Sequence, residues 1–192
     1  MTIPFAKLGI PPAVEKQLGS SSPKKLRLTI ASGLMPLTAE AQLGALYVLG
    51  TDDDADVART ARKTLAGLPS GQIMAAIGIK THPKVLEFLA QFRKVSAELD
   101  ERIGMLRTAN DRTIRLIASR ANPSLCTQLS RNHERLLVTP DVFIDLHANP
   151  NCDDMTLQRA EGFLRMQKQL PEVPERRPFE ASEEELEDAV DA

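Results

Sequence analysis

The sequence predicts an all-α protein, an irregular α-solenoid of about five stacked helix pairs with a disordered acidic C-terminal tail. Three observations lead to this prediction. Apolar residues recur at helical spacing along the chain, and no stretch alternates between apolar and polar residues as a strand does. Short turn sequences recur between the predicted helices, and acidic residues are concentrated at the C-terminus. The 42% hydrophobic and 26% charged residues are ordinary values for a globular protein.

Residues 1–37 are predicted to form an N-terminal capping segment with short helices. Val14 and Leu18 indicate one short helix, and residues 24–30 indicate another. A Ser-rich joint, residues 19–23, separates the two. Because the terminal repeat of a solenoid must shield an otherwise open apolar face, we expect this less regular segment to cap the array.

Residues 38–170 are predicted to form the solenoid, and polar or proline residues mark the helix starts. Ser, Thr, Asp and Asn side chains can accept hydrogen bonds from the first backbone N–H groups of a helix, and proline fits the first turn. The predicted starts are Thr38, Asp52–Asp54, Ser70, Pro83, Ser96, Asn110, Pro123, Asn132, Pro140 and Asp153. We expect Ile73, Ile77 and Ile79 to share the helix that Ser70 begins. Leu89, Ile117 and Leu146 should be almost fully buried.

The turns between helices repeat in sequence. Ala121-Asn122-Pro123 returns 27 residues later as Ala148-Asn149-Pro150, and a related Thr81-His82-Pro83 lies upstream. Asn can cap the helix that follows or end the one that precedes, and proline prevents the earlier helix from continuing. Helix pairs that recur in this way, each too small to bury its own apolar face, are typical of a solenoid.

The segment D-x-x-V-A-R-x-A-R-x-x-L at Asp54–Leu65 resembles the second helix of HEAT-type repeats. The Ala-Asn-Pro breaks between short helices resemble the leucine-rich-repeat variant, another helical solenoid of bacterial proteins. Together the two resemblances cover residues 38–165. They imply a binding scaffold that presents a concave surface to another protein, and they imply no catalytic residues.

Residues 171–192 form the acidic tail. This segment holds nine acidic residues against two basic ones, a net charge of −7, whereas residues 1–170 hold 22 basic and 17 acidic residues, a net charge of +5. Its three prolines and low apolar content predict disorder. The tail either folds back on the basic helices of the body or serves only as a solubilising extension.

The sequence lacks the motifs of known catalytic, nucleotide-binding and metal-binding sites, so we expect a non-enzymatic protein without cofactors. Four residues of zinc-ligand type, Cys126, His133, His147 and Cys152, lie close in sequence, but their spacing matches no ligand motif. We expect both cysteines to fill core space. No run of apolar residues is long enough to span a bilayer and no signal peptide is evident, which favours a cytoplasmic protein without membrane insertion.

Basic residues concentrate on the second helices of the predicted pairs and are the candidate partner-binding residues. A protein with an acidic surface or peptide is the favoured partner, and a merely solvated helix face is the alternative. Nucleic-acid binding is less favoured because the body has only a small positive charge and few aromatic residues. A role as regulatory subunit of an enzyme complex also remains open, and oligomeric state is not predicted. The candidate residues are Arg59, Arg62, Lys84, Arg112, Arg115, Arg135 and Arg159.

Overall fold

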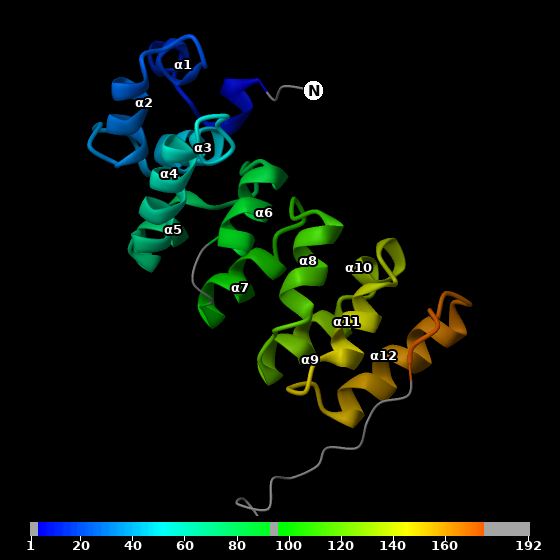
Figure 1. Cartoon of the computed structure of the whole chain (residues 1–192). Helices are drawn as coiled ribbons and strands as arrows, with labels where there is room; N and C mark the ends of the chain where they lie inside the picture. Colours follow the sequence, from blue (N-terminus) through cyan, green and yellow to red (C-terminus); the bar gives the residue numbers. More distant parts are fainter. Residues whose placement is uncertain (1–3, 93–95, 175–192) are drawn as a thin grey trace, which may run out of the picture. The chain divides into compact units, whose positions relative to one another are not determined.

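The computed structural model describes residues 4–92 and 96–174, and over these ranges it is entirely helical (Figure 1). The all-α prediction is therefore confirmed. Most of the predicted acidic tail, residues 175–192, lies outside the described residues. The described helices are the 3-10 helix η1 (Phe5–Leu8) and α1 (Pro12–Leu18), α2 (Lys24–Ala31), α3 (Ala39–Gly50), α4 (Ala55–Gly67), α5 (Ser70–Ala76), α6 (Pro83–Phe92), α7 (Ala97–Gly104), α8 (Asp111–Ala118), α9 (Pro123–Arg131), α10 (His133–Val138), α11 (Val142–Ala148) and α12 (Asp154–Met166).

Several predicted cap residues begin helices as expected. The Thr38 hydroxyl accepts a hydrogen bond from the backbone N–H of Ala41 at 3.3 Å, and the Asp54 carboxylate accepts from Asp56 and Val57. The side chains of Asn122, Asn132 and Asp153 make the equivalent bonds for α9, α10 and α12. Each bond satisfies a backbone donor that has no partner inside the helix, so these helix starts are encoded locally.

The chain divides into two compact units, residues 1–117 and 118–192. In the first unit, α3 packs against α2, α4, α5, α6 and η1. Gly44 lies where η1 crosses α3, because a Cβ atom on it would come within 2.1 Å of the Leu8 carbonyl oxygen. The predicted capping segment thus packs directly on α3. The boundary between residues 117 and 118 has no counterpart in the sequence pattern.

Ion pairs join α2 to the segment that leads into α4. Arg27 pairs with Asp52, and both side chains are almost completely buried. Lys24, one turn earlier on α2, pairs with Asp54 at 2.9 Å and with Asp56 at 2.8 Å. The acidic run 52–54 therefore does more than face the helix dipole: it fixes α2 against the start of α4.

In the second unit, α9 packs against α10 and α12, and α11 also contacts α12. The two Ala-Asn-Pro turns are hydrogen-bonded to each other. The Asn149 side chain is buried, and its Nδ2 donates to the carbonyl oxygens of Ala118 and Ala121, both at 2.9 Å. Asn122 caps the helix that follows it, whereas Asn149 ends α11 with an extended backbone. The same triplet thus has two different structural roles.

The burial matches the prediction at three core positions and departs from it after α5. Leu89, Ile117 and Leu146 are each 0% exposed, as predicted. The expectation that Ile77 and Ile79 share α5 is wrong: α5 ends at Ala76, Ile77 follows it with an extended backbone, and Ile79 is 80% exposed. The Thr81 hydroxyl accepts a hydrogen bond from the Gly78 N–H at 2.9 Å, and this turn replaces another turn of helix.

Candidate functional site

The seven predicted partner-binding residues are divided between the two units. Arg59 and Arg62 lie on α4, and Lys84 lies on α6. The other four are Arg112 and Arg115 on α8, Arg135 on α10 and Arg159 on α12. The first five belong to the first unit and the last two to the second. The candidate site is therefore described from contacts within the first unit.

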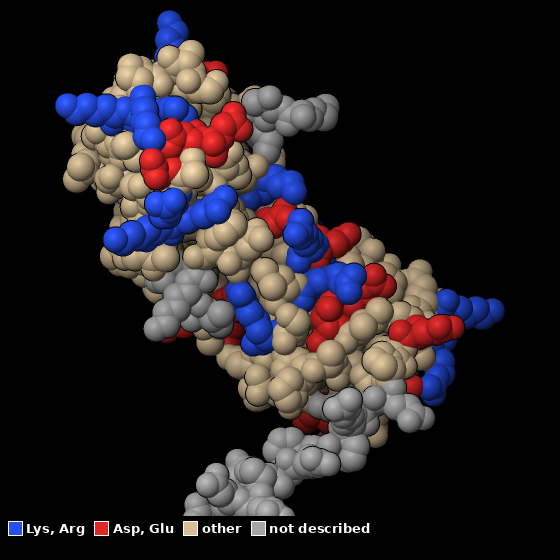
Figure 2. All heavy atoms as spheres, viewed as in Figure 1, with Lys and Arg blue, Asp and Glu red and all other residues tan. Residues whose placement is uncertain are grey.

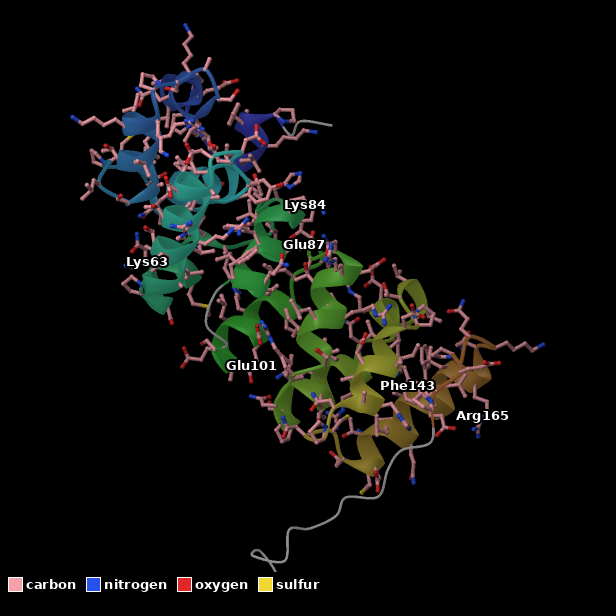
Figure 3. All side chains as sticks on the ribbon, viewed as in Figure 1. Lys63, Lys84, Glu87, Glu101, Phe143 and Arg165 are labelled. Atoms are coloured by element: carbon pink, nitrogen blue, oxygen red, sulfur yellow. The ribbon has the colours of Figure 1, made fainter. Side chains whose placement is uncertain are left out.

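Two of these residues converge on one buried carboxylate. Glu87 on α6 has a side chain only 11% exposed; its Oε2 is 2.8 Å from Lys84 Nζ, and its Oε1 is 3.4 Å from an Arg112 guanidinium nitrogen. Asn110 Nδ2 donates to Oε2 at 3.0 Å, and Figure 3 shows Lys84 and Glu87 together on α6. Burial raises the pKa of Glu87, but the hydrogen bonds from Lys84 and Asn110 outweigh it and hold that pKa below its ordinary value.

This cluster predicts a pH-dependent stability. A carboxyl whose pKa is depressed by folding stabilises the native state above its unfolded pKa, near 4.3, and the contribution is lost as the pH falls through the folded value. We expect Glu87→Gln to lower the free energy of unfolding by about 1–2 kcal/mol at neutral pH. The difference from the unmodified protein should shrink on acidification, as measured by urea unfolding over a pH series. Glu98→Gln, at an exposed position on α7, is the control and should be neutral; a difference that does not change with pH would contradict this prediction.

The two arginines on α4 have different surroundings. Arg62 donates from Nε to the Gly50 carbonyl oxygen at 3.0 Å, and its guanidinium lies 4.7 Å from the centre of the Phe92 ring. These contacts hold Arg62 against the protein. Arg59 has a side chain 75% exposed, and within the described part of the chain its ion pair is a long contact, 3.5 Å, with Asp56. Arg59 is therefore the more available of the two for an external ligand.

The remaining candidates show how charge is distributed. Arg115 and Arg135 also interact with other residues of the chain, and Arg159 is exposed on α12. On the face of the first unit seen in Figure 2, acidic side chains are interspersed among the basic ones. On that face the basic side chains of this unit occur in small groups separated by acidic ones, and they do not form a continuous strip.

An open groove in the first unit brings basic and small polar side chains together. Its volume is about 720 Å³, and it lies between the end of α2, α3 and α4. Arg59 and Lys63, one turn apart on α4, provide its positive charge, and Figure 3 shows Lys63 extending outward from this part of the molecule. None of the ion pairs found among the described residues involves Lys63. The groove is lined by Ser32, Gly33, Gln42, Arg59, Thr60, Lys63, Thr64, Gly67 and Leu68.

The end of α2 shapes one wall of this groove. Gly33 has φ 72°, a left-handed conformation that favours glycine, and it ends the helix. A Cβ atom on Gly33 would lie 3.2 Å from Gln42 Nε2, so that amide nitrogen faces the Gly33 backbone. Gln72 donates to Gln42 Oε1 at 2.7 Å, which fixes the orientation of the amide. The wall therefore presents a hydrogen-bond donor near the two basic side chains.

The opposite part of the groove, around Gly67, is unobstructed. A Cβ atom built on Gly67 has no other atom within 4 Å, so a larger side chain can be placed there without a clash. The hydroxyls of Ser32 and Thr60 donate to the carbonyl oxygens of Leu28 and Asp56, both at 2.7 Å. Their protons are used internally, and Arg59, Lys63 and Gln42 supply the donors to a ligand. An anionic, hydrogen-bond-accepting ligand such as a carboxylate suits this arrangement.

Comparison with known proteins identifies no relative. The chain matches no protein-family model, no curated protein and no solved structure. The resemblance to HEAT-type and leucine-rich-repeat-variant solenoids therefore stays a prediction, and the site has to be interpreted from its own chemistry.

The four residues of zinc-ligand type do not come together as a set. Cys126 and Cys152 are both buried thiols, whereas the His133 ring stacks on Phe163, with 3.8 Å between ring centres. Among the described residues there is no group of three or more His, Cys, Asp or Glu side chains that could hold a metal ion. None of the described helices is long and apolar enough to cross a membrane.

Part of the groove could be predicted from the sequence. Arg59 was among the predicted residues, and Lys63 lies on the same basic helix, four positions on. Ser32, Gly33 and Gln42 were missed because they come from other helices and are brought to α4 only by tertiary packing. The available signal was Gly33, a glycine two positions after the last residue of α2, which is typical of a helix end.

Proposed function

We propose that this chain is a non-enzymatic protein-interaction module that binds an acidic segment of a partner protein in the groove between α2, α3 and α4. The observation that carries the proposal is the groove itself, about 720 Å³ of open space with Arg59 and Lys63 in its wall. We propose a cytoplasmic scaffold or adaptor role, in keeping with the predicted solenoid architecture.

The chemistry of the groove favours a carboxylate-bearing peptide. Arg59 can pair with a carboxylate through two parallel hydrogen bonds, and Lys63 adds a second charge one turn along α4. The amide nitrogen of Gln42 and the apolar side chain of Leu68 offer a hydrogen-bond donor and a small apolar contact. An extended segment with acidic and apolar residues in alternation could use all three kinds of contact.

Nucleic acid is the less favoured ligand. A phosphate backbone binds most strongly to basic side chains that follow one another along a surface. Here Lys24 pairs with Asp56, and Lys84 and Arg112 pair with Glu87, so these basic side chains of the first unit are already balanced by carboxylates and do not extend the positive charge of Arg59 and Lys63. The single tyrosine and absence of tryptophan leave few aromatic platforms for base stacking.

Charge reversal in the groove tests the proposal. The probe is a fluorescein-labelled peptide of alternating glutamate and leucine, titrated with the full chain and followed by fluorescence anisotropy. Exposed ion pairs contribute about 0.2–1 kcal/mol each, so Arg59→Glu combined with Lys63→Glu should weaken binding about ten-fold or more. Raising the salt concentration should also weaken binding.

A matched variant separates the groove from overall charge. Lys16→Glu combined with Lys25→Glu changes the net charge equally at exposed positions that do not line the groove, and it should leave the affinity nearly unchanged. Equal losses in the two double variants would indicate nonspecific attraction and would overturn the groove as the site. Tighter binding to single-stranded DNA than to the peptide would favour the nucleic-acid alternative. Binding of a partner that is itself an enzyme would specify the module as a regulatory subunit.

A further inference from the structure

His82 immediately precedes α6 and supplies the acceptors for its first turn. Pro83, the first residue of the helix, has no backbone N–H, so the next three residues carry the first donors. The Val85 and Leu86 N–H groups donate to the His82 carbonyl oxygen at 2.9 and 3.3 Å. The Lys84 N–H donates to His82 Nδ1 at 3.2 Å. The imidazole therefore takes the role that an Asp or Asn side chain has at other helix starts of this chain.

The turn before α6 holds the backbone next to His82 in place. The Gly78 N–H donates to the Thr81 hydroxyl at 2.9 Å, and the Thr81 N–H donates to the Gly78 carbonyl oxygen at 3.0 Å. His82 is half-buried beside a cleft of about 10 Å³, which has room for no more than about one water molecule. The ring thus follows a hydrogen-bonded turn and is only partly hydrated.

Most of the charged groups beside the His82 ring are basic. The cleft is lined by Lys7 of η1, Lys80 of the preceding turn and Glu40 of α3. Lys84 follows two positions along the chain, in the first turn of α6. Glu40 is the one carboxylate among the lining residues, and a carboxylate favours a charged ring. Partial burial and the positive charges of Lys7 and Lys84 act in the opposite direction and hold the pKa of His82 below its ordinary value of 6.5.

We propose that His82 is a pH-sensitive cap that holds the first turn of α6 when its ring is neutral and releases that turn when the ring is protonated. A neutral imidazole has one nitrogen that accepts a hydrogen bond, whereas the protonated ring carries a proton on both nitrogens and can only donate. Protonation would place an N–H group opposite the Lys84 N–H, and a positive ring at the positive end of the helix dipole. The cap is independent of the proposed function, since His82 does not line the groove.

The response should be confined to the first turn of α6. Val85 and Leu86 are 3% and 0% exposed, so their side chains hold the helix against the core. Lys84 would lose the acceptor of its backbone N–H, and its ammonium group lies 2.8 Å from the Glu87 carboxylate. Because the folded chain binds the proton of His82 less readily than the unfolded chain, the contribution of the cap to stability is complete above pH 6.5. It is lost as the pH falls through the pKa of the folded chain.

An NMR titration of the ¹⁵N-labelled full chain between pH 5 and pH 8 tests the cap. At pH 8 the His82 ring should carry its proton on Nε2 and none on Nδ1, and its titration midpoint should lie below 6.5. The Lys84 amide resonance should move with the same midpoint. Its protection from hydrogen exchange should fall about five-fold, the typical effect of losing a cap. Glu87 stays ionised over this range, because its pKa lies below its ordinary value of 4.5.

Two substitutions separate the cap from other effects of pH. His82→Asn supplies a side-chain oxygen that does not titrate, so the Lys84 amide should show no transition. His147→Asn makes the same change at a half-buried histidine of the other unit, and it should leave the Lys84 transition unaltered. A His82 midpoint at or above 6.5, a Lys84 amide that does not follow the titration, or a transition that persists in the His82→Asn variant would overturn the proposal. The unmodified chain decides the first two outcomes even if a variant fails to fold.

Discussion

Replacing Asp52 by alanine should lower the free energy of unfolding by about 3–5 kcal/mol, because the substitution leaves Arg27 buried without its counter-charge. Both side chains of this ion pair are almost excluded from solvent, with 10% exposure for Arg27 and 7% for Asp52. Asp52 also accepts a hydrogen bond from the backbone N–H of Asp54 at 2.8 Å, which organises the start of α4. Urea unfolding followed by circular dichroism measures the change.

Asp53 provides the matched control for this substitution. It is the next residue in the same acidic run, it is exposed, and none of the ion pairs in the described part of the chain includes it. Asp53→Ala should change the free energy of unfolding by no more than about 0.5 kcal/mol. Similar losses for the two variants would mean that the Arg27–Asp52 pair does not hold α2 against α4.

The second large effect should come from Leu89→Ala. Leu89 on α6 is 0% exposed, so removing its methyl groups leaves a cavity that close-packed neighbours fill only in part. Such truncations cost about 2–5 kcal/mol. Leu34→Ala makes the same chemical change at a position that is 74% exposed, and it should be almost neutral in the same unfolding experiment. A Leu89→Ala variant as stable as Leu34→Ala would contradict the position assigned to α6 in the core.

The helices could be predicted from sequence because their start signals are local. Thr38, Asp54 and Asn122 bond to backbone N–H groups two or three residues away, so a short stretch of sequence contains the whole interaction. Ile79 shows the limit of periodicity: its spacing fits α5, but a hydrogen bond between Gly78 and Thr81 ends the regular structure before it. Asn149 is a second limit, because its partners near Ala121 lie 28 positions away.

The candidate site was less predictable because its properties depend on residues distant in sequence. The basic character of Lys84 and Arg112 was evident, yet Glu87 contacts both side chains and balances much of their charge. Ser32 and Gln42 carry no charge, so nothing in the sequence marked them as residues of a binding site. They nevertheless line the groove together with Lys63.

Titration of the ¹⁵N-labelled full chain with the glutamate–leucine peptide, followed by NMR, tests the proposed binding site most directly. Binding in the groove should produce the largest amide shift changes at Gly33, Thr64 and Gly67, with smaller changes elsewhere in the first unit. Gly67→Glu, which places a carboxylate in the open part of the groove, should suppress these changes, whereas the uncharged Gly67→Gln should suppress them less. Shift changes centred on other helices, or none at peptide concentrations that saturate the anisotropy signal, would contradict an acidic-segment site between α2, α3 and α4.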